Sequence, residues 1–317
     1  MTNARGTDSR VVFLMGPTAA GKTEAAIRLC EAFPFEIVSV DSSLVYRRLN
    51  IGSAKPPPSL LKTYPHYLID ICDPHETYSA ANFRRDALAA IATIQQRGKI
   101  PLLVGGTGLY FRTLERGIAE LPEIPETLRE QLRSEYNQHG SVAMHKQLQA
   151  VDAPSAARIH PNDPQRILRA LEVYRASGCT LTAHFAQQED TKCAFDITKI
   201  VYAPTEKALL HEPIRERFEH MLGAGFINEV IGLRRDSRLS EATPALRAVG
   251  YRAVWQFLDG QISRQQMVHD GIVATRRLAK RQYTWFRSEA NCIWVDPLSL
   301  GSFAHLHKLI KREVFST

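Results

Sequence analysis

The chain contains 317 residues, and 44% of them are hydrophobic, which is an ordinary share for a globular enzyme with a sizeable core. The net charge is +7, and the stretch between Arg247 and Arg287 holds eight Lys or Arg and two Asp, which indicates a polyanionic ligand larger than a nucleotide. The five cysteines contain no C-x-x-C pair, so neither a zinc site nor a disulfide framework is supported. We find no apolar leader and no stretch long enough to span a bilayer, and we expect a cytoplasmic protein.

The first predicted strand, residues 11–15, leads directly into a phosphate-binding loop and a helix predicted over 22–32. The loop has the Walker A sequence Gly16-Pro17-Thr18-Ala19-Ala20-Gly21-Lys22-Thr23. Backbone N–H groups at the helix N-terminus and the Lys22 ammonium bind phosphoryl oxygens, and the Thr23 hydroxyl can hold Mg²⁺. The alternative is a Gly-rich turn without a ligand, which the order of strand, loop, Lys-Thr and helix disfavours.

A second predicted strand, residues 36–40, ends at Asp41 and completes a βαβ unit. Ligands of open α/β sheets bind at the carboxyl ends of the strands, so Asp41 is well placed for chemistry beside the loop. Asp41 is also suited to cap the turn after the strand, and the two roles are compatible.

The remaining elements predict a sheet interrupted by helices. A strand over 67–71, a helix from about residue 79 to Gly98 and a strand over 100–104 are followed by helical segments from about 117 to 188, namely 125–138, 141–150 and 164–177. Strand signals return at 199–203 and 292–295, with a helix ending near residue 222 between them. The pattern predicts an α/β fold, with a P-loop NTPase-like parallel sheet (1–116 and 189–317) and an all-helical insertion (117–188).

A long helix is predicted over residues 265–287, with one packed side and one cationic side. Its apolar stripe is Met267, Gly271, Ala274, Leu278 and Trp285. The opposite side carries Arg276, Arg277, Lys280, Arg281 and Arg287. The alternative is an ordinary solvated surface, but few acids are present to pair with these bases.

Taken together, the motifs resemble those of the tRNA dimethylallyltransferases, also called tRNA isopentenyltransferases. The Walker loop alone occurs in many enzymes, but its combination with the other segments is specific, and the resemblance covers nearly the whole chain. The shared segments are 16–23, 41–47, 51–56, 78–83, 105–110, 163–172, 249–252 and 280–286.

The resemblance implies transfer of a dimethylallyl group from dimethylallyl diphosphate to N6 of adenine 37 in tRNAs that read codons beginning with U, with Mg²⁺ as cofactor. Residues 16–23 would hold the diphosphate, and Thr23 the metal. The implied catalytic residues are Lys22, Asp41, Thr107 and Arg217. Asp41 would accept the amine proton, and Arg217 would clamp the diphosphate. We expect a monomer, because no apolar interface stands out.

The resemblance also implies a tRNA-binding surface, with the helical insertion closing on the anticodon stem. Four aromatic side chains of this surface could stack on RNA or pack in the core, and packing is at least as well supported for Trp285. The implied contacts are Asp41, Ser42, Ser43, Leu44, Thr107, Arg129, Gln165, Arg166, Ile167, Leu168, Arg169, Arg247, Ala248, Val249, Gly250, Tyr251, Arg252, Lys280, Arg281, Gln282, Tyr283, Thr284, Trp285, Phe286 and Arg287.

Two positions depart from the family pattern. Pro213 stands where the family usually has Arg, which removes one basic contact and predicts a later start of the surrounding helix. His66-Tyr67 replaces the common His pair, and we assign His66 a structural role.

Two other functions fit part of the sequence. A P-loop kinase, or a prenyltransferase acting on free adenylate, would use the Walker loop but not the basic helix. A non-catalytic RNA-binding module with a nucleotide switch would not need Asp41 beside the loop.

Overall fold

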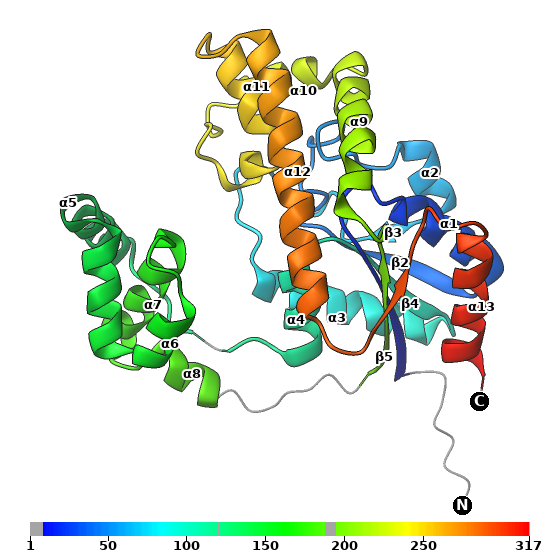
Figure 1. The fold of residues 1–317 in the computed structure, drawn as a ribbon, viewed down its shortest axis with the longest axis horizontal. Helices are drawn as coiled ribbons and strands as arrows, with labels where there is room; N and C mark the ends of the chain where they lie inside the picture. The colour runs from blue at the N-terminus through cyan, green and yellow to red at the C-terminus, as the bar shows by residue number, and fades with distance from the viewer. Residues whose placement is uncertain (1–8, 120, 188–194, 317) are drawn as a thin grey trace, which may run out of the picture. The chain divides into compact units, whose positions relative to one another are not determined.

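The computed structural model describes residues 9–119, 121–187 and 195–316. The chain divides into two compact units, one formed by residues 1–115 with 194–317 and the other by 116–193 (Figure 1). The insertion predicted over 117–188 falls inside the second unit. None of the described helices is long and apolar enough to cross a bilayer.

The first unit is built on a parallel sheet of six strands (Figure 1). Met15 at the end of the first strand lies opposite Gly105, and Gly105 lies opposite Val40, so the loops after three strands leave the sheet at one edge. The predicted α/β class with a parallel sheet is confirmed. In spatial order the strands are β3 (His66–Tyr67), β2 (Phe35–Val40), β4 (Ile100–Gly105), β1 (Arg10–Met15), β5 (Asp196–Tyr202) and β6 (Cys292–Val295).

The edge strand β3 is shorter than the strand predicted over 67–71. Only His66 and Tyr67 pair with β2. Leu68 and Asp70 then adopt positive φ angles of 65° and 57°, which turn the chain away from the sheet. The apolar residues of this segment therefore predicted too long a strand, because an apolar pattern does not show where the backbone turns.

Helices cover both faces of the sheet. On one face, α1 (Lys22–Ala32) and α13 (Ser302–Phe315) pack on alternate side chains of the strands, such as Val12 and Leu14. On the other face, α3 (Ala80–Gln96), α4 (Gly108–Arg116) and the C-terminal half of α12 (Arg264–Ser288) pack on Val11 and Phe13. The predicted N-terminus of α3 is confirmed, with Ser79 accepting from Asn82 N–H at 3.1 Å. The helix α13 has no counterpart among the elements predicted from the sequence.

The N-terminal half of α12 belongs to a second core formed with residues 45–51 and neighbouring helices. Gly271 allows close packing there, because a Cβ at this position would lie 2.2 Å from the Phe218 ring. The helices of this core are α9 (His211–Gly223), α10 (Phe226–Arg234) and α11 (Tyr251–Leu258), with a short 3-10 turn at Pro244–Arg247. The first unit also contains α2 (Pro58–Thr63) and a 3-10 turn at Lys207–Leu210. Pro213 lies in the first turn of α9 and does not delay its start, because N–H groups of a first turn have no helical partner.

The buried side of α12 differs from the predicted stripe. Met267 and Gly271 are buried as expected, but Ala279, Tyr283 and Phe286 form the buried positions farther along. The change arises because the two halves of the helix pack against different cores. Leu278 and Trp285 remain only partly buried.

The second unit contains α5 (Glu126–Val151), α6 (Ala153–Arg158), α7 (Pro164–Ser177) and α8 (Leu181–Gln187). Gly140, with φ 75° and ψ 172°, interrupts α5 between the two helices that the sequence predicts. Asp163 caps α7, which the sequence predicts over 164–177, and Gly178 ends it in a left-handed conformation. Leu132, Met144 and Ile167 form part of its own core.

Candidate active site

A large pocket of the first unit lies where the strand-end loops meet. Its volume is about 1130 Å³, which is large enough for a nucleobase together with a small diphosphate ester. The Walker loop, the turn after β2, α9 and α12 all contribute to its wall. The pocket thus brings together Lys22, Asp41, Arg217 and Gln282, which are far apart in the sequence.

The Walker loop is held tightly against the sheet. Gly16 N–H donates to Gly105 O at 3.2 Å, and a Cβ on Gly16 would lie 2.2 Å from Tyr202 O, so a larger residue does not fit. Gly21 begins α1 with a φ of 80°. Lys22 donates from Nζ to Pro17 O at 2.7 Å. Burial lowers the pKa of Lys22 to about 7, against the opposing effect of nearby Asp41.

Asp41 uses one carboxylate oxygen to organise the turn after β2. Its Oδ1 accepts from Ser43 N–H at 2.7 Å and from Leu44 N–H at 3.3 Å. In the described part of the chain, no group donates a hydrogen bond to Oδ2. The capping role proposed from the sequence is therefore present, and the second oxygen is available to a ligand.

Thr107 joins the loop after β4 to this turn. Its N–H donates to Val40 O at 3.2 Å, and its Oγ1 accepts from Ser42 N–H at 3.1 Å. Because the hydroxyl oxygen accepts in this contact, its proton remains available for donation. Gly105 permits the close approach, since a Cβ there would lie 2.0 Å from Val40 O.

Arg217 approaches the Walker loop from α9. Its Nη1 lies 3.5 Å from Thr18 Oγ1, to which it donates a weak hydrogen bond. Burial lowers the pKa of Arg217, while Asp41 acts in the opposite direction, and the guanidinium stays charged. Lys22, Arg217 and Thr18 therefore form a cationic, hydrogen-bonding end of the pocket, which suits a compact dianion or trianion.

The similarity to known proteins decides the family. A family model described as IPP transferase matches residues 44–289, most of the chain. This chain belongs to the IPP transferase family. It is therefore an enzyme of the prenyltransferase class.

Solved structures of relatives agree with this assignment. A tRNA isopentenylpyrophosphate transferase from Bacillus halodurans is 32% identical, with 97% of each chain covered and a TM-score of 0.70. A tRNA delta(2)-isopentenylpyrophosphate transferase from Staphylococcus epidermidis is 33% identical, with 97% of this chain and 99% of that chain covered and a TM-score of 0.69. A eukaryotic dimethylallyltransferase acting on tRNA shares the fold, with 23% identity, coverage of 97% and 79%, and a TM-score of 0.81.

The residues predicted to contact RNA are buried, partly buried or exposed in this IPP transferase. Ile167, Gly250, Tyr251, Tyr283 and Phe286 are buried, so the core-packing alternative holds for these three rings. Both tyrosine hydroxyls donate to groups within the protein. Tyr251 donates to Glu229 Oε1 at 2.7 Å, and Tyr283 donates to Pro204 O at 2.6 Å. The exposed group is Ser42, Gln165, Arg166, Arg247, Arg252, Lys280, Arg281, Thr284 and Arg287.

Glu229 is a structural support of the transferase pocket that the sequence analysis missed. Its carboxylate accepts from the N–H groups of Asn50, Ile51 and Gly52 at 2.9, 2.7 and 3.2 Å. These hydrogen bonds fix residues 50–52, which line the pocket. A single Glu within a helix gives no sequence signal for such a role.

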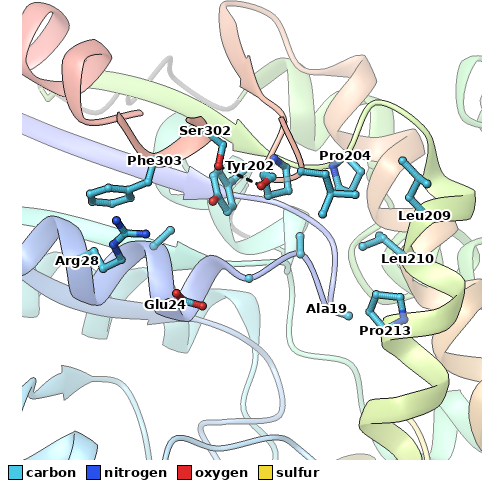
Figure 2. Close-up of a pocket in the computed structure, with 15 residues that line it drawn as sticks. Ala19, Glu24, Arg28, Tyr202, Pro204, Leu209, Leu210, Pro213, Ser302 and Phe303 are labelled. Carbon is cyan, nitrogen blue, oxygen red and sulfur yellow. Dashed lines mark hydrogen bonds between the residues drawn. The ribbon is translucent and has the colours of Figure 1, made fainter. Parts of the chain in front are cut away.

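A second, smaller cavity also adjoins the Walker loop of the transferase (Figure 2). Its volume is about 300 Å³. Figure 2 shows Arg28 beside Phe303, with the guanidinium carbon 3.6 Å from the ring centre. Pro213 lines this cavity and does not line the larger one. An Arg side chain at this position would therefore leave the backbone beside the smaller cavity. Asp41 and Arg217 line the larger pocket and not this smaller cavity.

Proposed function

We propose that this transferase moves a dimethylallyl group from dimethylallyl diphosphate to N6 of adenine 37, next to the anticodon, in tRNAs that read codons beginning with U. The products are N6-(dimethylallyl)adenosine and diphosphate. The observation that carries the proposal is one pocket that contains both a Walker loop and an Asp41 oxygen without a hydrogen-bond donor in the described residues. Similarity to two bacterial tRNA isopentenylpyrophosphate transferases supports the same class of substrates.

The donor diphosphate would bind in the Walker loop. Lys22 would exchange its hydrogen bond to Pro17 O for phosphoryl oxygens, and Arg217 would add a second positive charge beside Thr18. Both cations are partly withdrawn from water, so their attraction for the diphosphate is stronger than on an open surface. The attraction grows as negative charge develops on the leaving group, which lowers the barrier to its departure.

Thr23 fits a magnesium ion that binds together with the diphosphate. Its side chain is exposed in the first turn of α1, and its hydroxyl makes no hydrogen bond to other described residues. The described residues contain no group of three or more His, Cys, Asp or Glu suited to a metal, so diphosphate oxygens and water would complete the coordination. Bound there, Mg²⁺ would supply further positive charge to the leaving diphosphate.

Asp41 and Thr107 would act on the entering adenine. The N6 nitrogen forms a bond to the allylic carbon, the bond from that carbon to the diphosphate oxygen breaks, and its electron pair leaves with the diphosphate. The N6 proton passes to Asp41 Oδ2. Because an exocyclic amine is a poor nucleophile, this proton transfer contributes to the rate. Thr107 would donate its hydroxyl proton to the base and orient it.

The adenine must leave the stacked anticodon loop to reach Asp41. The exposed cations Arg247, Lys280 and Arg281 border the pocket or lie on the adjoining helix and would hold RNA phosphates. We further propose that the helical unit binds the anticodon stem through Arg129, Gln165, Arg166 and Arg169. The proposal requires a macromolecular acceptor, which separates this enzyme from one that prenylates free adenylate.

The direct test uses purified protein, Mg²⁺, labelled dimethylallyl diphosphate and unmodified tRNA with adenine at position 37. We expect label on the RNA and a modified nucleoside of the mass of dimethylallyladenosine. Matched tRNAs with guanine at position 37 should remain unlabelled. Matched tRNAs that differ only at position 36 should show preference for adenine there, since position 36 pairs with the first codon base.

Three results would contradict this function. Label on free AMP but not on tRNA would favour an adenylate prenyltransferase. ATP turnover without prenyl transfer would favour a kinase-type enzyme. Tight RNA binding without transfer of label would favour a non-catalytic RNA-binding module.

A further inference from the structure

The carboxamide of Gln282 bridges two loops of the active site. Its Oε1 accepts from Thr18 N–H in the Walker loop at 2.9 Å, and its Nε2 donates to Gly106 O in the loop after β4 at 3.0 Å. Gly106 is needed for this contact, because a Cβ there would lie 2.2 Å from Gln282 Nε2. Both hydrogen-bonding ends of one α12 side chain are thus used to hold the site together.

The bridged loops are already joined to each other and to the Asp41 turn. Gly16 N–H donates to Gly105 O, and Ser42 N–H donates to Thr107 Oγ1. The resulting network connects the diphosphate side of the pocket with the adenine side. Gln282 is the contact through which α12, which is remote from these loops in the sequence, enters this network.

The same part of α12 presents cations to solvent. Lys280 and Arg281 directly precede Gln282 and are exposed. One turn later, the Trp285 ring packs on Gly108, where a Cβ would lie 2.2 Å from the ring. If bound RNA displaced or stabilised this segment, Gln282 would therefore transmit the change to the position of Thr18. The Thr18 hydroxyl also contacts Arg217.

We propose that Gln282 is a positioning residue that couples RNA binding on α12 to diphosphate binding in the Walker loop. The inference rests on the proposed function, in which RNA binds α12 and the diphosphate binds the loop. RNA on α12 holds Gln282 in place, Gln282 fixes Thr18, and the loop then binds diphosphate more tightly. By reciprocity, diphosphate tightens RNA binding by the same factor.

The test measures the affinity for inorganic diphosphate, in Mg²⁺, with and without an anticodon stem-loop RNA. For the unmodified protein we expect RNA to tighten diphosphate binding by about fivefold or more. Gln282→Met keeps the side-chain length but removes both hydrogen bonds, and it should bring this ratio close to one. The matched control is Gln266→Met, which removes a carboxamide on the exposed first turn of the same helix and should keep the ratio.

A second measurement uses the unmodified protein alone. The stem-loop RNA, added without diphosphate, should slow amide hydrogen exchange of the Walker loop, including Thr18. Unchanged exchange, or an unchanged ratio in a folded Gln282→Met protein, would overturn the coupling and leave Gln282 a structural residue. The prenylation assay of the unmodified protein reports on the function separately, because it succeeds or fails whatever the ratio is.

Discussion

The cations predicted to bind RNA are held differently on α12 of the first unit and in the helical unit. On α12 of the first unit, Arg277, Lys280 and Arg281 have no carboxylate within ion-pair distance among the described residues. In the helical unit, the arginines predicted to bind tRNA are each paired with an acid of the same helical segment. These pairs are Arg129–Glu126 at 3.0 Å, Arg166–Asp163 at 3.2 Å and Arg169–Glu172 at 3.5 Å.

This difference predicts two kinds of RNA contact. An unpaired cation on α12 attracts a phosphate at full strength, releases counterions on binding and contributes strongly to salt dependence. A paired arginine must first exchange a carboxylate for a phosphate. Since exposed ion pairs contribute only about 0–1 kcal/mol, the exchange is possible, but its net gain is small. The first unit should therefore dominate both the chemistry and the affinity for RNA.

The largest effect is expected for Asp41→Asn in the first unit. The variant keeps an oxygen for the N–H groups of Ser43 and Leu44 but cannot accept the amine proton. We expect kcat to fall by about 10²-fold to 10⁴-fold, with the tRNA Kd changed less than about twofold. The matched control is Asp73→Asn, which alters a partly exposed carboxylate paired with Arg47. Equal losses in kcat and tRNA affinity would make Asp41 a positioning residue instead.

Arg217→Met should mainly impair the donor. Removing a charged hydrogen-bond donor to the diphosphate costs about 1.5–3 kcal/mol, which corresponds to a rise of about tenfold to 100-fold in the KM for dimethylallyl diphosphate. Arg215→Met on the same helix is the control, because Arg215 pairs with Glu212 and Glu219 at an exposed position. A donor KM that changes no more than in the control would contradict the diphosphate clamp.

Neutralising α12 tests the unpaired cations. The triple variant Arg277→Gln, Lys280→Gln and Arg281→Gln should weaken tRNA binding and flatten the plot of log affinity against log salt by about 0.7–0.9 for each phosphate that the variant no longer neutralises. Binding titrations at several salt concentrations measure both. The variant Lys308→Gln, Lys311→Gln and Arg312→Gln removes the same charge from α13. If both variants give the same salt slope, α12 is an ordinary solvated surface.

Asp152→Asn tests what holds the helical unit together. Asp152 is buried, and although burial alone would raise its pKa, hydrogen bonds from Thr182 and Ser155 lower the pKa below its ordinary value. Weakening these hydrogen bonds should cost about 1–3 kcal/mol of unfolding free energy at pH 7. A carboxylate with a lowered pKa stabilises the fold above its unfolded pKa, near 3.8, and loses this effect as the pH falls further.

Calorimetric unfolding of the full chain, from pH 7 down to pH 3, measures the difference in unfolding free energy between the parent protein and Asp152→Asn. This difference in unfolding free energy should become smaller at the acid end of the range. If the difference in unfolding free energy stayed constant with pH, the loss of stability would come from packing rather than from the charge of Asp152.

The smallest effect is expected for Glu126→Gln in the helical unit. The change releases Arg129 and Arg133, which lie 3.0 and 3.6 Å from the Glu126 carboxylate. We expect tRNA affinity to rise by less than about threefold and the salt slope to steepen slightly. Glu130→Gln removes an exposed acid from the same helix and serves as the control. A decrease in affinity relative to this control would show that the arginine must stay paired to bind RNA.

The sequence by itself determined the features that depend on neighbouring residues. The Walker loop, the strands around it and the caps of α3 and α7 follow from contiguous patterns, because their backbone contacts join residues a few positions apart. Asp41 was also predictable, since a strand that follows a Walker loop and its helix belongs to the same parallel sheet. Most of the residues to which we assign the proposed chemistry were thus visible before the fold.

Only the tertiary structure decided how distant segments use their side chains. Gln282 and Thr18 are separated by 264 positions, and Glu229 reaches Ile51 across 178, so neither hydrogen bond leaves a local pattern. From the sequence, the rings of Tyr251 and Tyr283 could stack on RNA or pack in the core, and both are buried, Tyr251 in one core and Tyr283 in the other. Local sequence determines which backbone conformation a segment adopts, whereas the burial of its side chains depends on which other segments of the chain pack against it.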